Sequence, residues 1–272
     1  MAIAATAVSV EASASVTLTI TGLPIAYLLR VRRVSETGVR TPVRGVTGLL
    51  DGTVPITSAT VVLEDYEAPL LTPVSYLVEA LPSGAGTAQS YQSDPVVIPH
   101  SDATVAWLKD PGAPQRNVAV LVKTVPSWVR PIEQAVHRVA GRRNAVVLSG
   151  VRSGQEGDLT VWTRSAEERE SLNWLLSSGT VLLWQTAPGR GVSDMYVSVA
   201  QSAETPDSDG DLADLWQEWT LPLTEQDMPT AIGVGGSAGR TWQSVLSAFS
   251  TWQGVRDTYA TWEAVFLDRR TE

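Results

Sequence analysis

Residues 235–239, Gly-Gly-Ser-Ala-Gly, have the spacing of the Gly-x-Ser-x-Gly turn that presents a nucleophilic serine in many hydrolases. Such a serine needs a histidine base that follows it in the chain, and the only two histidines, His100 and His137, precede it. The neighbouring segments do not alternate strand and helix as in an α/β-hydrolase, and the lysine of a phosphate-binding loop is absent. We interpret 235–239 as a flexible linker and predict that the protein is not an enzyme.

A second candidate site is acidic. Asp207, Asp209 and Asp211, followed by Glu218, resemble the ligand spacing of a calcium-binding loop, but the glycine at 210 comes two positions earlier than an EF-hand requires. We interpret the segment as a solvated loop between two strands, with calcium binding as the alternative. Two separated histidines do not form a metal site either, so we predict no metal and no cofactor.

Composition excludes several classes of function. The chain has 272 residues, 43% of them hydrophobic, which is enough for two domains, and a net charge of −9. It lacks the concentrated cationic surface that nucleic acids or anionic membranes require. The absence of cysteine excludes disulfides, thiolate nucleophiles and Cys-ligated zinc. The longest aliphatic run, 118–122, has five residues, so we predict neither membrane insertion nor a leader segment.

The first part of the chain predicts a β-sandwich. Short segments alternate apolar and polar residues with the period of a half-buried strand, and turn residues separate them at a spacing typical of sandwiches. These segments are Val16–Ile20, Ile25–Val34, Thr60–Leu63 and Val74–Val78. The stretch Trp107–Pro114, with two prolines and a glycine, breaks regular structure. We therefore predict a sandwich domain over 1–106 and a short, stiff junction over 107–116.

The middle of the chain predicts a β-rich domain with one helix, over 117–230. Strands are expected at 117–125 and 144–151, and at 158–163 as the hairpin partner of 144–151. Ser165 and Glu168 form a capping box, the stripe Leu172, Leu175, Leu176 is apolar at helical spacing, and Gly179 is a typical helix stop. Further strands are expected at Thr180–Gln185, Met195–Val199 and Leu215–Leu223.

The C-terminal part, 231–272, predicts a glycine-rich linker followed by a helical arm. The pair Thr-Trp recurs every ten residues, at 241–242, 251–252 and 261–262, and each tryptophan has a valine three residues later. An apolar spacing of three to four favours a helix with one aromatic face, which must be covered by protein. We predict that its aromatic residues lie at a subunit interface. They are Trp242, Phe249, Trp252, Tyr259 and Trp262. The predicted fold class is therefore mainly β, with β-sandwich domains, one helix across the second domain and a C-terminal helical arm.

Two resemblances add to this interpretation. Asp65–Pro69, Pro73–Ala80 with Tyr76, and Ser93 with Pro95 resemble the last two strands of a fibronectin type III domain. Over most of its length the chain resembles a minor tail protein of long-tailed bacteriophages, of the distal tail type found in phages of actinobacteria. The segments that carry this second resemblance are 65–69, 107–111, 149–157, 172–183, 195–198, 221–223 and the Thr-Trp repeats.

The second resemblance implies a function. Distal tail proteins form a ring, usually a hexamer, which connects the tail tube to the tip hub and the receptor-binding parts. It implies self-association, other tail proteins as partners, and a place in the virion tail after assembly in the host cytoplasm. The alternative, from another class, is a carbohydrate-binding module in which the fibronectin-like unit presents a lectin-like sandwich to cell-wall or surface glycan. Most of the ten tryptophans lie at positions of strand or helix faces that predict burial, so they are not taken as sugar-stacking platforms.

Overall fold

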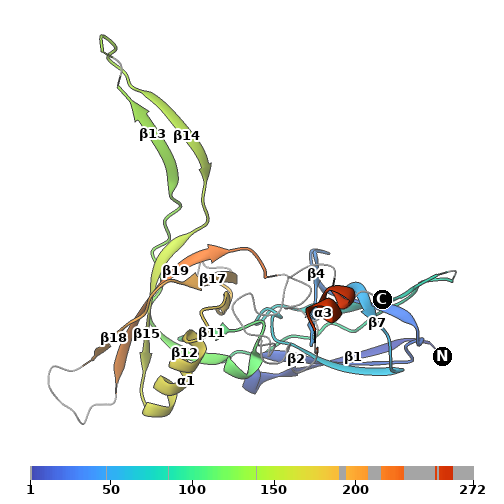
Figure 1. The fold of residues 1–272 in the computed structure, drawn as a ribbon. Helices are drawn as coiled ribbons and strands as arrows, with labels where there is room; N and C mark the ends of the chain where they lie inside the picture. The colour runs from blue at the N-terminus through green and yellow to red at the C-terminus, as the bar shows by residue number, and fades with distance from the viewer. Residues whose placement is uncertain are drawn as a thin grey trace.

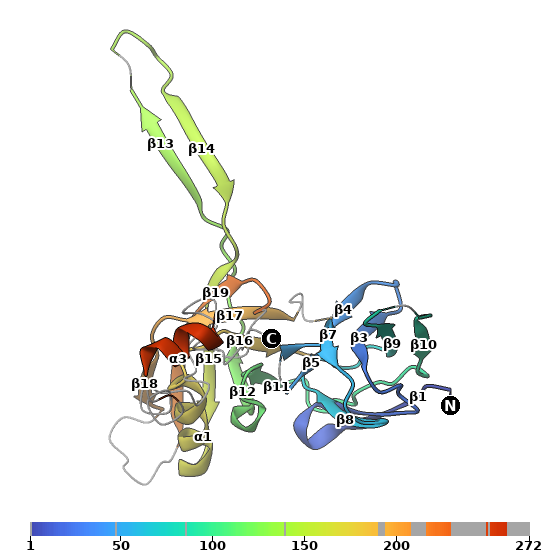
Figure 2. The same ribbon diagram turned by 45° about the vertical axis from the view of Figure 1, so that its right-hand side comes forward.

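The computed structural model describes residues 2–46, 48–84, 86–138, 140–189, 194–207, 216–229, 249 and 251–259. Its secondary structure is mainly β, as predicted. Two packed regions lie beside each other, and a long two-stranded hairpin extends away from both of them (Figures 1 and 2). In the part of the chain that the structure describes, no helix has the length and apolar character needed to cross a membrane.

The first region packs two antiparallel sheets around one core. One sheet has the order β1 (Ala4–Val10), β2 (Ser15–Thr21), β8 (Thr60–Asp65). The other has the order β10 (Gln89–Gln92), β9 (Val74–Pro82), β3 (Tyr27–Ser35), β4 (Arg40–Pro42), with β7 (Asp51–Pro55) also paired to β3. A small ribbon of β5 (Arg44–Gly45) and β6 (Gly48–Leu49) completes the region.

The period-two pattern correctly predicts which side chains face this core. In β2, Val16, Leu18 and Ile20 are fully buried, and in β9 Tyr76 and Val78 are buried likewise. These side chains belong to one hydrophobic cluster although they come from the two different sheets. The apolar faces of the two sheets therefore stabilise each other.

The second region is a closed antiparallel barrel, which corrects the prediction of a sandwich there. Its six strands follow the order β15 (Glu156–Thr163), β12 (Val118–Thr124), β11 (Val105–Lys109), β16 (Leu182–Gln185), β17 (Met195–Val199), β19 (Gln217–Gln226). The ten-residue strand β19 closes the ring because it pairs with β17 near its C-terminal end and with β15 over eight residues. The short strand β18 (Ala203–Pro206) pairs with the first half of β19.

Helix α1 (Ala166–Leu176) forms as the sequence predicts. Ser165 Oγ accepts a hydrogen bond from the backbone N–H of Glu168 at 3.2 Å, whereas the Glu168 carboxylate accepts from the N–H of Arg164 and not from that of Ser165. Leu172 and Leu175 are buried in the barrel core, and Gly179 has a left-handed φ of 62° just after the helix.

The substitution Ser165→Ala is expected to lower the free energy of unfolding by about 1 kcal/mol, because it leaves the N–H of Glu168 without its cap. Ser165→Thr, which keeps a hydroxyl acceptor, serves as the matched control and should retain most of the stability. Urea unfolding followed by circular dichroism measures both variants. Equal losses in the two would show that the hydroxyl is not the stabilising group.

The strand at 144–151 does not pair with 158–163, so that predicted hairpin is wrong. Strand β14 (Val146–Arg152) pairs instead with β13 (Ile132–His137), a strand that the sequence pattern does not predict. The connection after β14 is extended and crosses to other strands: Glu156 pairs with Val129, and the N–H of Glu225 donates to the carbonyl of Gln155. These bonds lead the chain from β14 into barrel strand β15. The predicted hairpin would have needed a tight turn at this place, with β15 folded back on β14.

Helix α3 (Trp252–Thr258) is shorter than the predicted arm. Thr251 caps its start by accepting a hydrogen bond from the N–H of Gly254, and Tyr259 is already extended, with φ −132° and ψ 130°. A single helix through 249–259 is therefore wrong: the threonine of this Thr-Trp pair begins a helix and does not continue one. The other two Thr-Trp pairs lie outside the described residues.

Candidate functional site

The β13–β14 hairpin is the most exposed structured element of the described chain. All seven residues of β14 are exposed, and so are five of the six in β13. Its base is held by hydrogen bonds from Ser153 N and Oγ to the Pro131 carbonyl, each 3.0 Å long, and from the Arg152 guanidinium to the Arg130 carbonyl at 3.2 Å. Beyond that base the ribbon projects away from the barrel in both views (Figures 1 and 2).

Both faces of this hairpin carry aliphatic side chains. Val136 lies opposite Val147 on one face, and Ala135 lies opposite Leu148 on the other. Val136, Val147 and Leu148 are 56%, 50% and 62% exposed, and Val151 near the base is 94% exposed. An isolated two-stranded ribbon is at best marginally stable in water, and apolar patches of this kind mark interaction surfaces. The hairpin therefore has the properties of an interaction element.

The tip of the hairpin is basic. Arg138, Arg142 and Arg143 are exposed there, beside the turn residue Gly141, whose φ is +81°. The sequence offered a signal for this element, namely a glycine turn between two segments of similar length. The partner strand was missed because Ile132–His137 reads Ile-Glu-Gln-Ala-Val-His, without apolar-polar alternation.

A buried polar cluster joins the two packed regions. Lys109, on barrel strand β11, is 1% exposed, and its Nζ donates to the carbonyl oxygens of Ala14 at 2.6 Å and Tyr66 at 2.8 Å in the first region. Burial lowers the pKa of Lys109 to about 7, against the opposing attraction of Asp65 and Asp194. The sequence predicts a junction at this place. Trp107 and Lys109 instead lie within β11, and the break falls on the turn at 110–113.

A buried ion pair lies in the first region behind Lys109. Arg33 Nη1 donates to both carboxylate oxygens of Asp65, at 2.9 and 2.7 Å, and the hydroxyl of Tyr76 donates to Asp65 Oδ2 at 3.0 Å. Burial alone would lower the pKa of Arg33, but the charges of Asp65, Tyr76 and Glu67 and the hydrogen bond to Asp65 together outweigh it, so the pKa is raised. Tyr76 thus orients a buried carboxylate.

Two further contacts cross between the regions. Gln185 Nε2, on β16, donates to the carbonyl of Ala68 at 3.1 Å, and Arg44 Nη2 donates to the carbonyl of Pro229 at 2.5 Å. Arg44 is itself fixed by a buried bond from its Nε to Glu67 Oε1 at 2.8 Å. Together with the bonds of Lys109, these bonds hold the two regions in contact.

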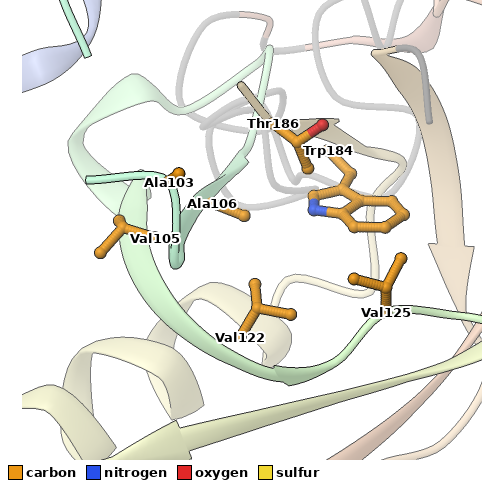
Figure 3. A pocket seen from close by; sticks show the side chains of 7 residues that line it. All are labelled: Ala103, Val105, Ala106, Val122, Val125, Trp184 and Thr186. Atoms are coloured by element: carbon orange, nitrogen blue, oxygen red, sulfur yellow. The ribbon is translucent and has the colours of Figure 1, made fainter. Parts of the chain in front are cut away.

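A small cavity in the barrel is too narrow for a metabolite (Figure 3). Trp184 and Thr186 line it together with small aliphatic side chains, and about 10 Å³ is open to a water-sized sphere. That space holds one water molecule at most. The indole N–H of Trp184 and the Thr186 hydroxyl are buried there without a hydrogen-bond partner, so a single water is the occupant that the cavity fits.

The acidic candidate loop lies partly outside the described residues, which include Asp207 and Glu218 but neither Asp209 nor Asp211. Lys123 pairs with both described carboxylates, with its Nζ 2.5 Å from Glu218 Oε2 and 3.8 Å from Asp207 Oδ1. Within the described ranges no three His, Asp or Glu side chains are grouped as metal ligands. The Nε2 atom of His100 is hydrogen-bonded to the carbonyl of Val105, whereas His137 lies on hairpin strand β13. The two histidines therefore do not share one metal or catalytic site.

The predicted interface aromatics are partly described. Phe249 and Tyr259 stack edge to face with centroids 5.7 Å apart, and Tyr259 and Val255 are buried. Trp252 is exposed on α3. Trp242, Trp262 and the motif at 235–239 lie outside the described residues.

Comparison with models of protein families gives no match, and comparison with curated proteins gives none either.

Proposed function

We propose that this chain is a non-enzymatic structural subunit of a bacteriophage tail tip. It assembles with copies of itself into a ring, a hexamer by resemblance, that connects the tail tube to the tip hub and receptor-binding parts. In this proposal the first region is the fibronectin type III-like unit, and the barrel with α1 is the distal-tail-like domain. The protein acts in the virion tail after assembly in the host cytoplasm.

The observation that supports the proposal is the hairpin with aliphatic side chains on both faces. An assembly protein can bury both faces of a projecting ribbon between neighbouring subunits.

We expect the full chain to form an oligomer of defined mass, and the triple substitution Val136→Ser, Val147→Ser, Leu148→Ser to weaken that association at least roughly 10-fold, as is usual when apolar anchors are lost from an interface. The matched control removes three exposed valines elsewhere, by Val8→Ser, Val46→Ser and Val62→Ser. Light scattering after size-exclusion chromatography, or native mass spectrometry, measures both. A monomeric wild-type chain at every concentration would refute the proposal.

A carbohydrate-binding role is the second candidate, and two exposed tryptophans favour it. Trp174 on α1 and Trp216 before β19 are 48% and 38% exposed, and indole faces are common sugar platforms. A monomer that sediments with cell-wall polysaccharide, and loses that binding on Trp174→Ala or Trp216→Ala, would support this role against the structural one.

A further inference from the structure

The hairpin carries a charge opposite to that of the rest of the chain. Residues 130–152 hold five of the twenty Lys and Arg residues and one of the twenty-nine Asp and Glu residues, a net +4. The remainder holds fifteen basic and twenty-eight acidic residues, a net −13. In the sequence no basic run is longer than two residues, but the fold collects these five arginines on one projecting ribbon (Figures 1 and 2).

All five arginines of the hairpin are exposed, and they form two groups. Arg138, Arg142 and Arg143 lie at the tip. Arg130 and Arg152 lie together at the base, where the Arg152 guanidinium donates to the Arg130 carbonyl. Within the described ranges every ion pair involves other basic residues, and none includes an arginine of the hairpin. These guanidinium groups are therefore open to an anion outside the chain.

The acidic body does not cancel the charge at the tip. Strand β14, Val146–Arg152, separates the two arginine groups and spans about 20 Å at about 3.3 Å per residue. Charges in solution at physiological salt are screened beyond about 8 Å. Because the tip lies more than two such lengths from the base, an anion that approaches it meets the arginines before it meets the field of the body.

Phosphate is the anion that exposed guanidinium groups suit best, because their planar N–H donors match its oxygens. A DNA duplex presents phosphates along its whole length, and its major groove admits a two-stranded β-ribbon. A ribbon that lies in this groove brings both arginine groups to the phosphates. A flat bilayer or an acidic loop would meet the tip of such a projecting ribbon and leave the arginines of the base unused.

We propose that the hairpin binds double-stranded DNA, with its ribbon in the major groove and its arginines on the phosphates of the groove walls. The binding is independent of base sequence, since phosphate contacts carry no sequence information. The inference goes beyond the proposed function. It depends on the arginine side chains of the hairpin, whereas the proposed oligomer depends on the aliphatic ones.

The salt dependence of binding tests the proposal. We expect the full chain to bind a fluorescent duplex of mixed sequence, with the logarithm of the binding constant falling against the logarithm of salt concentration by about 0.9 for each phosphate contacted. The tip variant carries Arg138→Gln, Arg142→Gln and Arg143→Gln. It should bind at least roughly 10-fold more weakly, and its slope should be smaller by about 2.7 for each hairpin engaged. Fluorescence anisotropy at a series of potassium chloride concentrations measures both.

Two matched controls separate the charge of the tip from other effects. Lysine at the same three positions keeps the charge, so this variant should keep the wild-type slope. A second control removes three charges elsewhere, on β3, on β4 and on α3, and should keep both affinity and slope. Its substitutions are Arg32→Gln, Arg40→Gln and Arg256→Gln. The tip side chains make no contact within the described chain that folding needs, so circular dichroism should show an unchanged fold.

The outcomes separate this inference from the proposed function. A wild-type chain that does not bind the duplex, or a tip variant with the wild-type slope, overturns the inference and leaves the oligomer standing. Tighter binding to polyglutamate, or to vesicles of phosphatidylcholine and phosphatidylserine in equal parts, also overturns it, because the ligand is then an acidic protein or a membrane. DNA binding by a chain that stays monomeric at every concentration supports the inference and refutes the proposed function.

Discussion

Asp65→Asn is expected to lower the free energy of unfolding by about 3–5 kcal/mol, the usual cost of leaving a buried charge without its partner. Asp65 is 2% exposed and accepts hydrogen bonds from Arg33, Tyr76 and the backbone N–H of Glu67. An asparagine in that place keeps the shape but cannot balance the guanidinium charge. Urea unfolding, followed by circular dichroism, measures the loss.

The control for Asp65 is an ion pair on β3 and β9, the strands that carry Arg33 and Tyr76. Arg30 on β3 and Glu79 on β9 are cross-strand partners with 3.6 Å between Nη1 and Oε2, but their side chains are 28% and 22% exposed. Glu79→Gln is therefore expected to cost less than about 1 kcal/mol. Adding Arg33→Met to Asp65→Asn should restore part of the stability, because it removes the unbalanced charge. Similar losses of unfolding free energy for Asp65→Asn and Glu79→Gln would contradict the argument that burial makes the Asp65 ion pair costly to break.

Sequence patterns predict the elements of this fold where local physics decides them. The alternation in β2 and β9 identifies the buried side chains, because a strand with one face in a core must alternate. The Ser165 cap identifies the start of α1, because the cap bond closes within four residues. Both signals depend on neighbours in the chain.

Long-range pairing could not be predicted in the same way. Closure of the barrel depends on the pairing of β15 with β19. The paired residues are about sixty positions apart in the chain, and neither segment contains a pattern that identifies the other as its partner. The β13–β14 hairpin was mispredicted for the same reason, because its strand pairing is not visible in either segment alone. Val146–Arg152 has the composition of a core strand, and only its actual partner, the polar segment Ile132–His137, shows that it projects from the body.

Lys109 shows a further limit of sequence interpretation. A lysine is almost always an exposed residue, and nothing around Trp107–Pro114 indicates otherwise. Its burial follows from two carbonyl groups, those of Ala14 and Tyr66, that the first region leaves pointing at strand β11. The exposed hairpin and the buried Lys109 are thus both products of tertiary contacts.

The buried amine of Lys109 predicts a particular dependence of stability on pH. In the unfolded chain this lysine keeps its proton up to its ordinary pKa of 10.5, whereas in the folded protein it loses the proton near pH 7. Between these values the unfolded state binds more protons, so the free energy of unfolding rises with pH, and this stabilisation is lost as pH falls toward 7. The slope from one such group is about 1.4 kcal/mol per pH unit.

The buried tyrosines set the upper limit of the pH range in which the effect of Lys109 can be measured alone. Burial and the bond to Glu64 raise the pKa of Tyr66 to about 12, and burial raises those of Tyr76 and Tyr196 further. Above pH 10 the unfolded tyrosines ionise first, so stability falls again. Unfolding should therefore be measured between about pH 7.5 and about pH 9.5, where the lysine acts without them.

Lys109→Met is expected to remove the rise of stability across that window, because methionine fills a similar volume and does not titrate. The chain offers one matched control, since Lys123 is its only other lysine. Lys123 is exposed, and its hydrogen bond to Glu218 raises its pKa, so Lys123→Met should keep the wild-type slope. The buried amine would not be the titrating group if stability were flat across this window in the wild type, or rose equally in Lys109→Met. A slope lost only in Lys109→Met would identify the contact between the two regions as the site that titrates.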